Sequence, residues 1–228
     1  MVFRWQDVSG DLSDLGVLVI DTLRATTTMA TMLEHGAEAV LPVADLSAAY
    51  RMKEQDPALL LAGERHNVPP SGFDGGNSPF DYPPERVSGR RIIFTTTNGT
   101  QAIDRAQAAK WVGCAALVNA AASAQAQQAA ALNGLIICAG TRGRLSLDDV
   151  LAGGAVAAHW PEATWTDAAR MAVMAYERYR GHLPEGLREA RHGQQLMRLG
   201  LQRDIDWCGN LDILTTVPTR QMTGWFTA

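Results

Sequence analysis

Short apolar runs alternate with longer amphipathic stretches over the first two thirds of the chain. The apolar runs end at turn residues, as buried strands do, and cover residues 16–20, 39–43, 59–62, 91–95, 111–112 and 135–139. The stretches between them fit helices over residues 26–35, 46–55, 100–109 and 120–132, the second with Asp45 or Ser47 as its N-cap. Nearly continuous apolar strands that alternate with helices predict an α/β fold whose largely parallel sheet is covered on both faces.

The pattern becomes mainly helical from residue 147 onward. Helices are expected over residues 148–159, 166–179, 187–192 and 194–199, with Thr166 as the N-cap of the second, and an apolar patch follows near residues 211–217. No linker separates this part from the rest, so we expect a single domain over residues 1–228. A division into subdomains near residues 1–146 and 147–228 stays open.

The segment from residue 63 to residue 90 breaks the alternation. It holds five of the ten prolines and is predicted to be a long loop. Loops of this length inside a compact domain are usually functional or disordered, and this one is rich in polar side chains such as Glu64, Arg65 and Asp74. We therefore expect it to do more than connect two elements.

Composition and charge narrow the choice of partners. The 228 residues carry a net charge of -4 and the 20 Lys and Arg residues are scattered, so we expect no nucleic-acid partner. No apolar run approaches the ~20 residues that cross a bilayer, and the N-terminus shows no leader pattern. The three cysteines match no zinc-site spacing and suit reduced, buried thiols. These features predict a cytoplasmic protein without a membrane partner, and they leave a small anionic ligand open.

Three of the apolar runs end in small hydroxyl residues, and the first of them reads IDTLRATTT (20–28). Asp21 directly follows the strand, where open parallel sheets gather their ligand-binding groups, so its carboxylate is a candidate Mg²⁺ ligand. Arg24 offers a fork to phosphate or carboxylate, and Thr26 and Thr27 add hydroxyls at the start of a helix. The alternative is that Asp21 and the threonines only cap that helix.

The second run reads FTTTNGT (94–100). Its Asn98-Gly99 pair can adopt the positive φ that turns backbone amides toward an anion. Asn-Gly also forms hairpin turns, but a helical pattern rather than a strand follows it here. We therefore favour a phosphate-binding loop, to which hydroxyls contribute through Thr96, Thr97 and Thr100.

The third run reads CAGTRGRLSLDD (138–149). It supplies candidate anion-binding and metal-binding residues, namely Thr141, Arg142, Gly143, Arg144, Asp148 and Asp149. Carboxylates in a first helical turn are stabilised by the helix dipole, so one of the two aspartates is expected to have only that role, which leaves the other to bind metal. The chain contains no Walker sequence and no glycine-rich dinucleotide motif, which argues against nucleotide-dependent functions.

Two short motifs resemble other phosphatase signatures. IDTLRAT resembles the start of a haloacid-dehalogenase phosphatase, but Leu23 stands where such enzymes need a second aspartate. Arg191-His192-Gly193 resembles the signature of histidine phosphatases, which follows the first strand there, whereas here it lies within C-terminal helices. A structural role for His192 is the favoured interpretation, with ligand contact as the alternative.

Longer stretches match one family in its own order over most of the chain. They are IDTLRATTTMATMLEHGAEAVLPVADL, LAGER, PPSGFDGGNSPFDYPPERVSGRRIIFTTTNGTQAI, CAGTRGRLSLDDVLAGGAV, EARHGQQLMRLGLQRDIDWC and LDILTTVP. On these stretches the chain resembles the 2-phosphosulfolactate phosphatase (ComB-like) family. The resemblance implies a three-layer α/β/α fold and Mg²⁺-dependent hydrolysis of a phosphate ester on a small 2-hydroxy acid. In that family the named reaction releases 3-sulfolactate in coenzyme M biosynthesis.

The strand ends and the resemblance together suggest roles for the residues. We expect Mg²⁺ to be held by Asp21 with help from carboxylates among Glu64, Asp74, Asp148 and Asp149. We expect the transferring phosphoryl group to be stabilised by Arg24, Asn98, Arg142 and Arg144, together with the hydroxyls and backbone of the three strand ends. Arg65 and Arg191 are candidates for the acid end of the substrate.

Several alternatives stay open. Phospholactate and other 2-phospho acids need the same recognition as 2-phosphosulfolactate. We favour a metal-activated water as the nucleophile over an aspartyl-phosphate on Asp21. Rival functions are a histidine-type phosphatase acting through His192, an isomerase or lyase that uses the phosphate as a handle, and a non-catalytic binding protein for a small phosphorylated acid. Apolar faces on the C-terminal helices allow a homodimer, although core packing explains the same residues.

Overall fold

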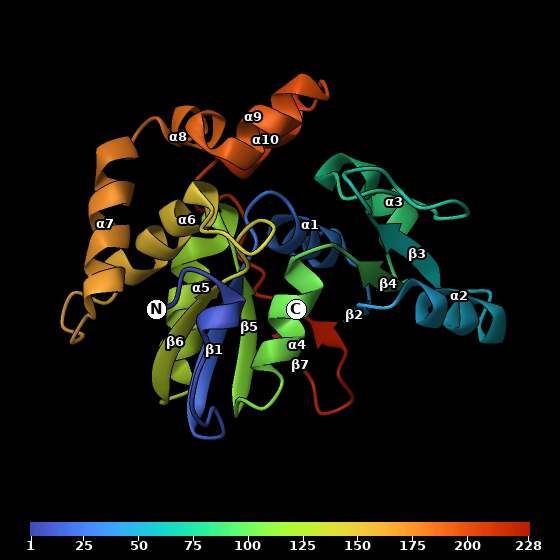
Figure 1. Ribbon diagram of the computed structural model, residues 1–228. Coiled ribbons are helices and arrows are strands. Elements are labelled where there is room, and N and C mark those ends of the chain that lie inside the picture. The colour runs from blue at the N-terminus through green and yellow to red at the C-terminus, as the bar shows by residue number, and fades with distance from the viewer.

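The computed structural model describes residues 1–228 and contains one eight-stranded mixed sheet (Figure 1). The strands run in the order β3-β4-β2-β8-β7-β5-β1-β6. Their bounds are β1 (Leu15–Ile20), β2 (Ala39–Pro42), β3 (Leu60–Gly63), β4 (Arg91–Thr95), β5 (Trp111–Ala115), β6 (Asn133–Cys138), β7 (Thr219–Arg220) and β8 (Phe226–Thr227). Helices pack on both faces of the sheet, which confirms the predicted three-layer α/β/α class.

The helices follow the predicted pattern closely in the first part of the chain. They are α1 (Ala25–Glu34), α2 (Leu46–Gln55), α3 (Pro84–Val87), α4 (Gly99–Ala106), α5 (Ala120–Ala129), α6 (Leu147–Ala158), α7 (Asp167–Tyr179), α8 (Leu183–Glu189), α9 (Arg191–Arg198) and α10 (Gln202–Cys208). The side chains of Asp45 and Thr166 cap α2 and α7, as the sequence predicts. None of the helices has the length and apolar character needed to span a membrane.

The C-terminal helices differ from the prediction in where they break. Residues 187–192 and 194–199 are expected to form two helices, but the break lies at Ala190, whose φ of -58° and ψ of 140° are not helical. His192 and Gly193 therefore lie in the first turn of α9 rather than at the end of a helix. The short helix α10 is not predicted at all, because seven residues give little periodicity to detect.

Side chains that alternate along β1 enter separate cores on the two faces of the sheet. Val17 and Val19 pack in the core that includes α1 and α4, whereas Leu18 and Ile20 pack in the core that includes α5 and α6. Because successive residues of a strand face opposite sides, burial of both faces explains why β1 reads as one continuous apolar run. The strand is thus anchored on both sides, and it fixes the position of the residue that follows it, Asp21.

The sheet consists of two parallel halves joined by a short antiparallel hairpin. One half holds β3, β4 and β2, the other holds β5, β1 and β6, and β7 and β8 lie between them. The hairpin pairs with each half at one residue, Phe226 with Val40 and Thr219 with Gly113. The sequence pattern predicts only an apolar patch near residues 211–217 and misses these strands, because two-residue strands have no period.

The predicted long loop between β3 and β4 is packed against the rest of the fold. Its first turn begins at Gly63, which has a φ of +131° and where a Cβ would lie 1.8 Å from the carbonyl oxygen of Thr95. Further along, the Thr28 hydroxyl on α1 donates a hydrogen bond of 3.1 Å to the carbonyl oxygen of Asn77. The loop is thereby held beside the first turns of α1, close to the carboxyl end of β1.

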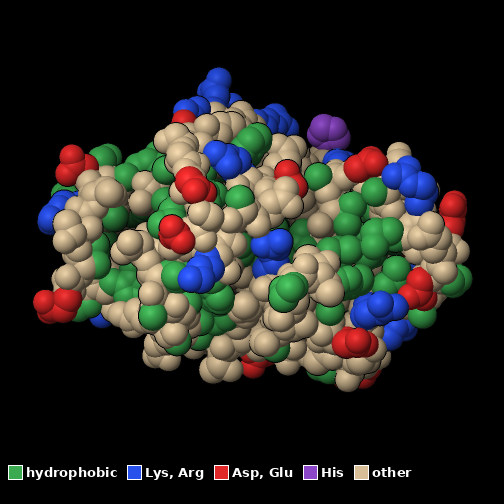
Figure 2. All heavy atoms as spheres, turned by 90° about the horizontal axis from the view of Figure 1, so that it is seen from below, with side chains coloured by type: hydrophobic (Ala, Val, Ile, Leu, Met, Phe, Trp, Pro, Cys, Tyr) green, Lys and Arg blue, Asp and Glu red, His purple; other side chains and the backbone are tan.

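Charged side chains of both signs are scattered over the face of the molecule that Figure 2 shows. Lys and Arg side chains lie among Asp and Glu side chains there, and neither kind gathers into a large patch. The distribution agrees with the scattered basic residues of the sequence. A site for a small ligand therefore has to be found from local geometry rather than from surface charge.

Candidate active site

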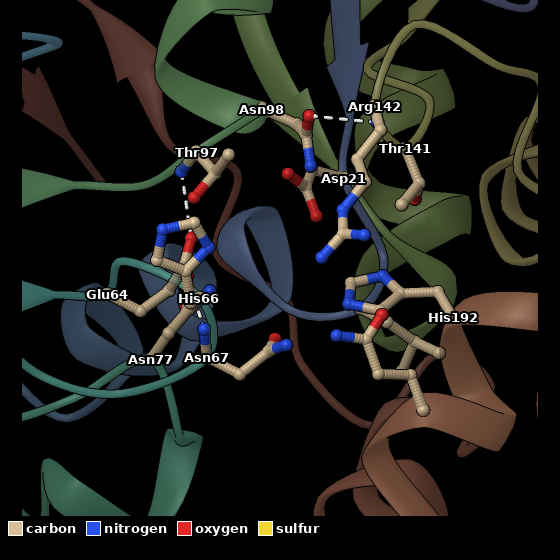
Figure 3. A pocket seen from close by; sticks show the side chains of 12 residues that line it. Asp21, Glu64, His66, Asn67, Asn77, Thr97, Asn98, Thr141, Arg142 and His192 are labelled. Carbon is tan, nitrogen blue, oxygen red and sulfur yellow. Dashed lines mark hydrogen bonds between the residues drawn. The ribbon is translucent and has the colours of Figure 1, made fainter.

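A small polar cleft lies at the carboxyl ends of β1, β3, β4 and β6 (Figure 3). Its lining residues are Asp21, Leu23, Glu64, His66, Asn67, Asn77, Thr97, Asn98, Thr141, Arg142, His192 and Gln195. Both halves of the sheet contribute strand ends, and α9 closes the cleft on one side. Because only Leu23 is apolar, the cleft suits a charged or strongly polar ligand.

Asp21 lies in the cleft with a carboxylate that has almost no partner in the protein. The residue is 7% exposed, and its carboxylate accepts only a long hydrogen bond of 3.4 Å from the backbone N–H of Ala25. Burial, followed by the negative charges of Asp148 and Glu64, raises the pKa of Asp21 to about 8. A Cβ on Gly99 would lie 2.8 Å from Asp21 Oδ2, so the start of α4 approaches this carboxylate directly.

Glu64 connects the loops that follow β3 and β4. One carboxylate oxygen accepts the backbone N–H of Asn67 at 2.7 Å and the other accepts the backbone N–H of Thr97 at 2.8 Å (Figure 3). Each oxygen keeps further acceptor capacity. Glu64 therefore fixes the shape of the cleft and still offers a negative charge to its interior.

The neighbouring aspartates at the start of α6 have different surroundings. Asp149 accepts the backbone N–H groups of Thr22 and Gly140, both at 2.9 Å, and so ties the ends of β1 and β6 together. Asp148 is also buried, and one of its oxygens accepts the Ser146 hydroxyl. Its charge helps to raise the pKa of Asp21, after the larger effect of burial. Asp149 thus has a structural role, but through hydrogen bonds to the ends of β1 and β6 rather than only through the helix dipole that the sequence suggests. Asp148 does not line the cleft.

Two residues predicted to bind metal or substrate lie outside the cleft because the fold uses their charges elsewhere. The Asp74 carboxylate accepts the backbone N–H of Leu61 at 2.8 Å and lies 3.5 Å from Lys53 Nζ, which fixes the loop to β3. The Arg65 guanidinium donates to Thr95 Oγ1 at 2.8 Å and to two backbone carbonyls. Both side chains stabilise the loop after β3, and neither lines the cleft.

Three of the predicted arginines also lie outside the cleft lining. Arg24 is buried and forms an ion pair with Asp204, whose other oxygen accepts the Ser78 hydroxyl at 2.9 Å. Arg144 and Arg191 are exposed. The sequence could not separate these arginines from a ligand-binding one, because the partner of Arg24 lies 180 residues away.

Arg142 is the arginine that lines the cleft. Its side chain extends between Asp21 and His192 (Figure 3). The residue has a φ of 52°, and its backbone N–H donates a long hydrogen bond of 3.4 Å to Asn98 Oδ1. This contact joins the loops after β4 and β6, so Arg142 and the start of α4 face the same space.

Most of the hydroxyl residues are used within their own turns. The Thr26 hydroxyl donates to the Asp21 carbonyl and the Thr27 hydroxyl donates to the Thr22 carbonyl, both at 2.9 Å. Thr96 and Thr100 form the corresponding bonds at the start of α4, with Thr96 Oγ1 accepting the backbone N–H of Thr100 at 3.2 Å. These four hydroxyl residues therefore stabilise the turns that lead into α1 and α4, and neither helix has a side chain that caps it at the N-cap position.

Thr97 and Thr141 are the hydroxyl residues that line the cleft, together with two side chains on α9. Burial lowers the pKa of His192, which keeps its imidazole neutral, although the charge of Asp148 acts in the opposite direction. The glycine that follows is required by packing, since a Cβ on Gly193 would lie 1.8 Å from the carbonyl oxygen of Leu187. His192 thus lines the cleft, and contact with a ligand stays a prediction.

The cleft also contains buried polar atoms without any partner in the protein. They are Asn77 Oδ1 and Thr97 Oγ1. Two further buried atoms without a partner, Thr22 Oγ1 and Arg24 Nε, belong to the segment that follows β1 but do not line the cleft. Unpaired buried polar atoms are costly, and a bound ligand or ion would satisfy them.

Sequence reasoning missed several lining residues, namely Leu23, His66, Asn67, Asn77 and Gln195. The adjacent His66 and Asn67 both have positive φ, of 57° and 66°. An Asn in a polar loop was a signal for such a conformation. For Asn77 and Gln195 no local pattern marks the residue, because packing between distant segments brings them to the cleft.

Comparison with known proteins gives the same assignment as the motifs. A family model described as 2-phosphosulpholactate phosphatase matches residues 5–223. The chain belongs to the 2-phosphosulfolactate phosphatase family. This confirms the resemblance drawn from the motifs, and the family name describes a hydrolase of a phosphoric monoester, the predicted enzyme class.

Relatives named "Probable 2-phosphosulfolactate phosphatase" match nearly the full length. The chain is 45% identical over 207 residues to one from Deinococcus radiodurans, covering 89% of this chain and 86% of the relative. It is 43% identical over 229 residues to one from Parasynechococcus marenigrum, covering 96% of this chain and 94% of the relative. A third, from Thermotoga petrophila, is 38% identical over 207 residues, with 89% and 87% covered.

Proposed function

We propose that this protein is a Mg²⁺-dependent phosphatase that converts 2-phosphosulfolactate to 3-sulfolactate and phosphate. One observation carries the proposal: a buried and nearly unpartnered Asp21 shares a polar cleft with Arg142 and the start of α4. Arginine and helix N-termini are groups that bind phosphate. A carboxylate beside them repels phosphate unless a cation lies between the two, so the arrangement favours a metal-assisted phosphate site. Family membership supports the choice of substrate.

The residues of the cleft fit Mg²⁺. No group of three or more Asp, Glu, His or Cys side chains is close enough to enclose a metal ion by itself. Mg²⁺ does not need such a group, because it keeps several waters and is usually bound by one or two carboxylates and by substrate phosphate. The raised pKa of Asp21 and the unpaired Asn77 Oδ1 are the two features that a cation would relieve. Asp21 would hold the ion, with Glu64 and Asn77 beside it.

A bound Mg²⁺ would supply neutralisation of phosphate oxygens and a lower pKa for a water that attacks phosphorus. The protein would supply the remaining contacts to the phosphoryl group. Arg142 would donate to its equatorial oxygens and stabilise charge that builds up in the transition state. The first N–H groups of α4, at Gly99 and onward, and the unpaired Thr97 hydroxyl would orient the same group.

Release of inorganic phosphate tests this function. Purified protein would be assayed with 2-phosphosulfolactate, 2-phospholactate and glycerol 3-phosphate, each with Mg²⁺ and with excess EDTA after removal of bound metal. We expect turnover of the 2-phospho acids with Mg²⁺ and none with EDTA. Binding without phosphate release across the panel would favour a binding protein, and product without phosphate release would indicate an isomerase or lyase.

A histidine-type phosphatase is the second candidate, because His192 lines the cleft in its neutral form. A neutral imidazole can attack phosphorus directly and needs no metal. Undiminished turnover of metal-free protein in EDTA, together with loss of activity in His192→Ala, would replace the metal-dependent mechanism by this one. If Mg²⁺ is required and His192→Ala retains turnover, the histidine mechanism is excluded.

A further inference from the structure

The side of the cleft formed by α9 differs chemically from the side formed by the strand ends. The strand ends supply carboxylates and Arg142, whereas α9 supplies His192 and Gln195. These two residues are three positions apart and so lie on the same face of the helix. Neither carries a full charge when the imidazole is neutral, and both can donate hydrogen bonds through N–H groups.

The polar groups of His192 and Gln195 are not used inside the protein. The neighbouring Gln194 donates from Nε2 to the carbonyl oxygen of Glu189 at 3.3 Å. No side-chain hydrogen bond inside the protein involves Gln195 or His192. The helix that carries them is rigidly placed. Gly193 packs against the carbonyl of Leu187, and Leu196 is fully buried in the core. The backbone at positions 192 and 195 is therefore held in place beside the cleft, which both side chains line.

The substrate named for the family carries anionic groups besides its phosphate. 2-Phosphosulfolactate carries a phosphate on its central carbon, a carboxylate on one side and a sulfonate on the other. The strand ends provide the groups suited to phosphate and its cation. A sulfonate spreads its charge over three oxygens and accepts hydrogen bonds from several directions, which neutral N–H donors on a separate surface can satisfy.

We propose that His192 and Gln195 bind the sulfonate of the substrate and thereby determine specificity among 2-phospho acids. The inference rests on the proposed function for the identity of the substrate. Arg65 and Arg191, which the sequence suggests for the acid end of the substrate, do not line the cleft. Arg142 extends between Asp21 and His192, and it marks the boundary between the phosphate end and the sulfonate end (Figure 3).

The test compares two substrates that differ only in the sulfonate. Kinetic constants and calorimetric binding would be measured for 2-phosphosulfolactate and 2-phospholactate with the wild type, Gln195→Ala and Gln194→Ala, each with Mg²⁺. Gln194→Ala is the matched control, because it removes the same side chain from the exposed face of the same helix. Loss of a hydrogen bond to a charged group is expected to raise KM and Kd for 2-phosphosulfolactate by about 10-fold or more in Gln195→Ala.

The same substitution is expected to change the constants for 2-phospholactate by less than about twofold, since that substrate lacks the sulfonate. His192→Ala should show the same selective loss, and His192→Asn, which keeps an N–H donor, should recover part of it. Equal losses for both substrates, or no loss for either, would overturn the assignment. Selective binding without turnover would overturn the proposed function and leave the sulfonate site standing.

Discussion

Buried carboxylates occupy two neighbouring regions at the carboxyl ends of the strands, and the two regions compensate their charges differently. In the supporting region, Asp149 accepts two backbone N–H groups at 2.9 Å, and Asp204 pairs with Arg24 and accepts the Ser78 hydroxyl. In the cleft, Asp21 accepts only one long hydrogen bond. Burial and neighbouring charge raise the pKa of both Asp21 and Asp149, so the two regions differ in hydrogen bonding rather than in the direction of the pKa shift. The same residue type thus has a structural role in one region and a carboxyl group with almost no hydrogen-bond partner in the other.

The difference separates residues that stabilise the fold around the cleft from residues that are available to bind a ligand in it. A buried charge without partners lowers the stability of a protein, so packing alone gives no reason to keep it. A ligand that supplies the missing positive charge does give one, and Asp21, unlike Asp149, has free acceptor capacity for it. The comparison therefore predicts that substitutions in the cleft affect activity, whereas substitutions in the supporting region affect stability.

The largest effect is expected for Asp21→Asn. Removal of the proposed metal-binding carboxylate should lower phosphate release by about 10³-fold or more, while the protein stays folded. Steady-state phosphate release with Mg²⁺ and circular dichroism on the same sample measure the two properties. Retention of most of the activity would remove Asp21 from the mechanism, and loss of the fold would move it to the supporting region.

A smaller effect on activity is expected for Arg142→Ala. Loss of one donor to a developing oxyanion typically costs about 10²-fold in kcat. Arg144→Ala is the comparison, because the two arginines flank Gly143 and only Arg142 lines the cleft. We expect Arg144→Ala to change kcat/KM by less than about threefold. Similar losses in both variants would mean that the loop after β6 rearranges when substrate binds.

The supporting region is tested by Asp149→Asn. An amide can accept one of the two backbone N–H groups but presents its own NH₂ to the other, so one buried donor is left unpaired. The free energy of unfolding should fall by about 2 kcal/mol, measured by urea denaturation. Activity per folded molecule should fall less than in Asp21→Asn. An unchanged midpoint with lost activity would show that Asp149 acts in the chemistry.

How far the sequence leads depends on whether a residue's role is set locally. Asp21, Thr97 and Arg142 could be found because strand periodicity fixes where a strand ends and parallel strands bring their ends together. The distinction between Arg142 and Arg144 could not be predicted, since both are exposed residues of one short loop and only the folded loop places Arg142 in the lining of the cleft. Arg24 and Gln195 depend on contacts between segments far apart in the chain, for which no local pattern exists.

The smallest expected effect concerns the pH dependence of stability. Since the folded pKa of Asp21 is raised from an ordinary 3.8 to about 8, the native state binds more protons than the unfolded state between these values. The contribution of Asp21 to the stability of the metal-free protein should therefore be most favourable below about pH 4, and it should be lost as the pH rises toward 8.

Asp21→Asn removes that contribution, so at pH 8 in EDTA the variant should be more stable than the wild type by at least about 1.4 kcal/mol, the equivalent of one pKa unit. Thermal and urea unfolding of both proteins at pH 5 to 8 measure the difference, and added Mg²⁺ should reduce it by stabilising the wild type alone. If the free energy of unfolding depends on pH in the same way in both proteins, the Asp21 carboxylate already has a favourable partner in the folded protein. The contrast between the cleft and the supporting region would then be wrong.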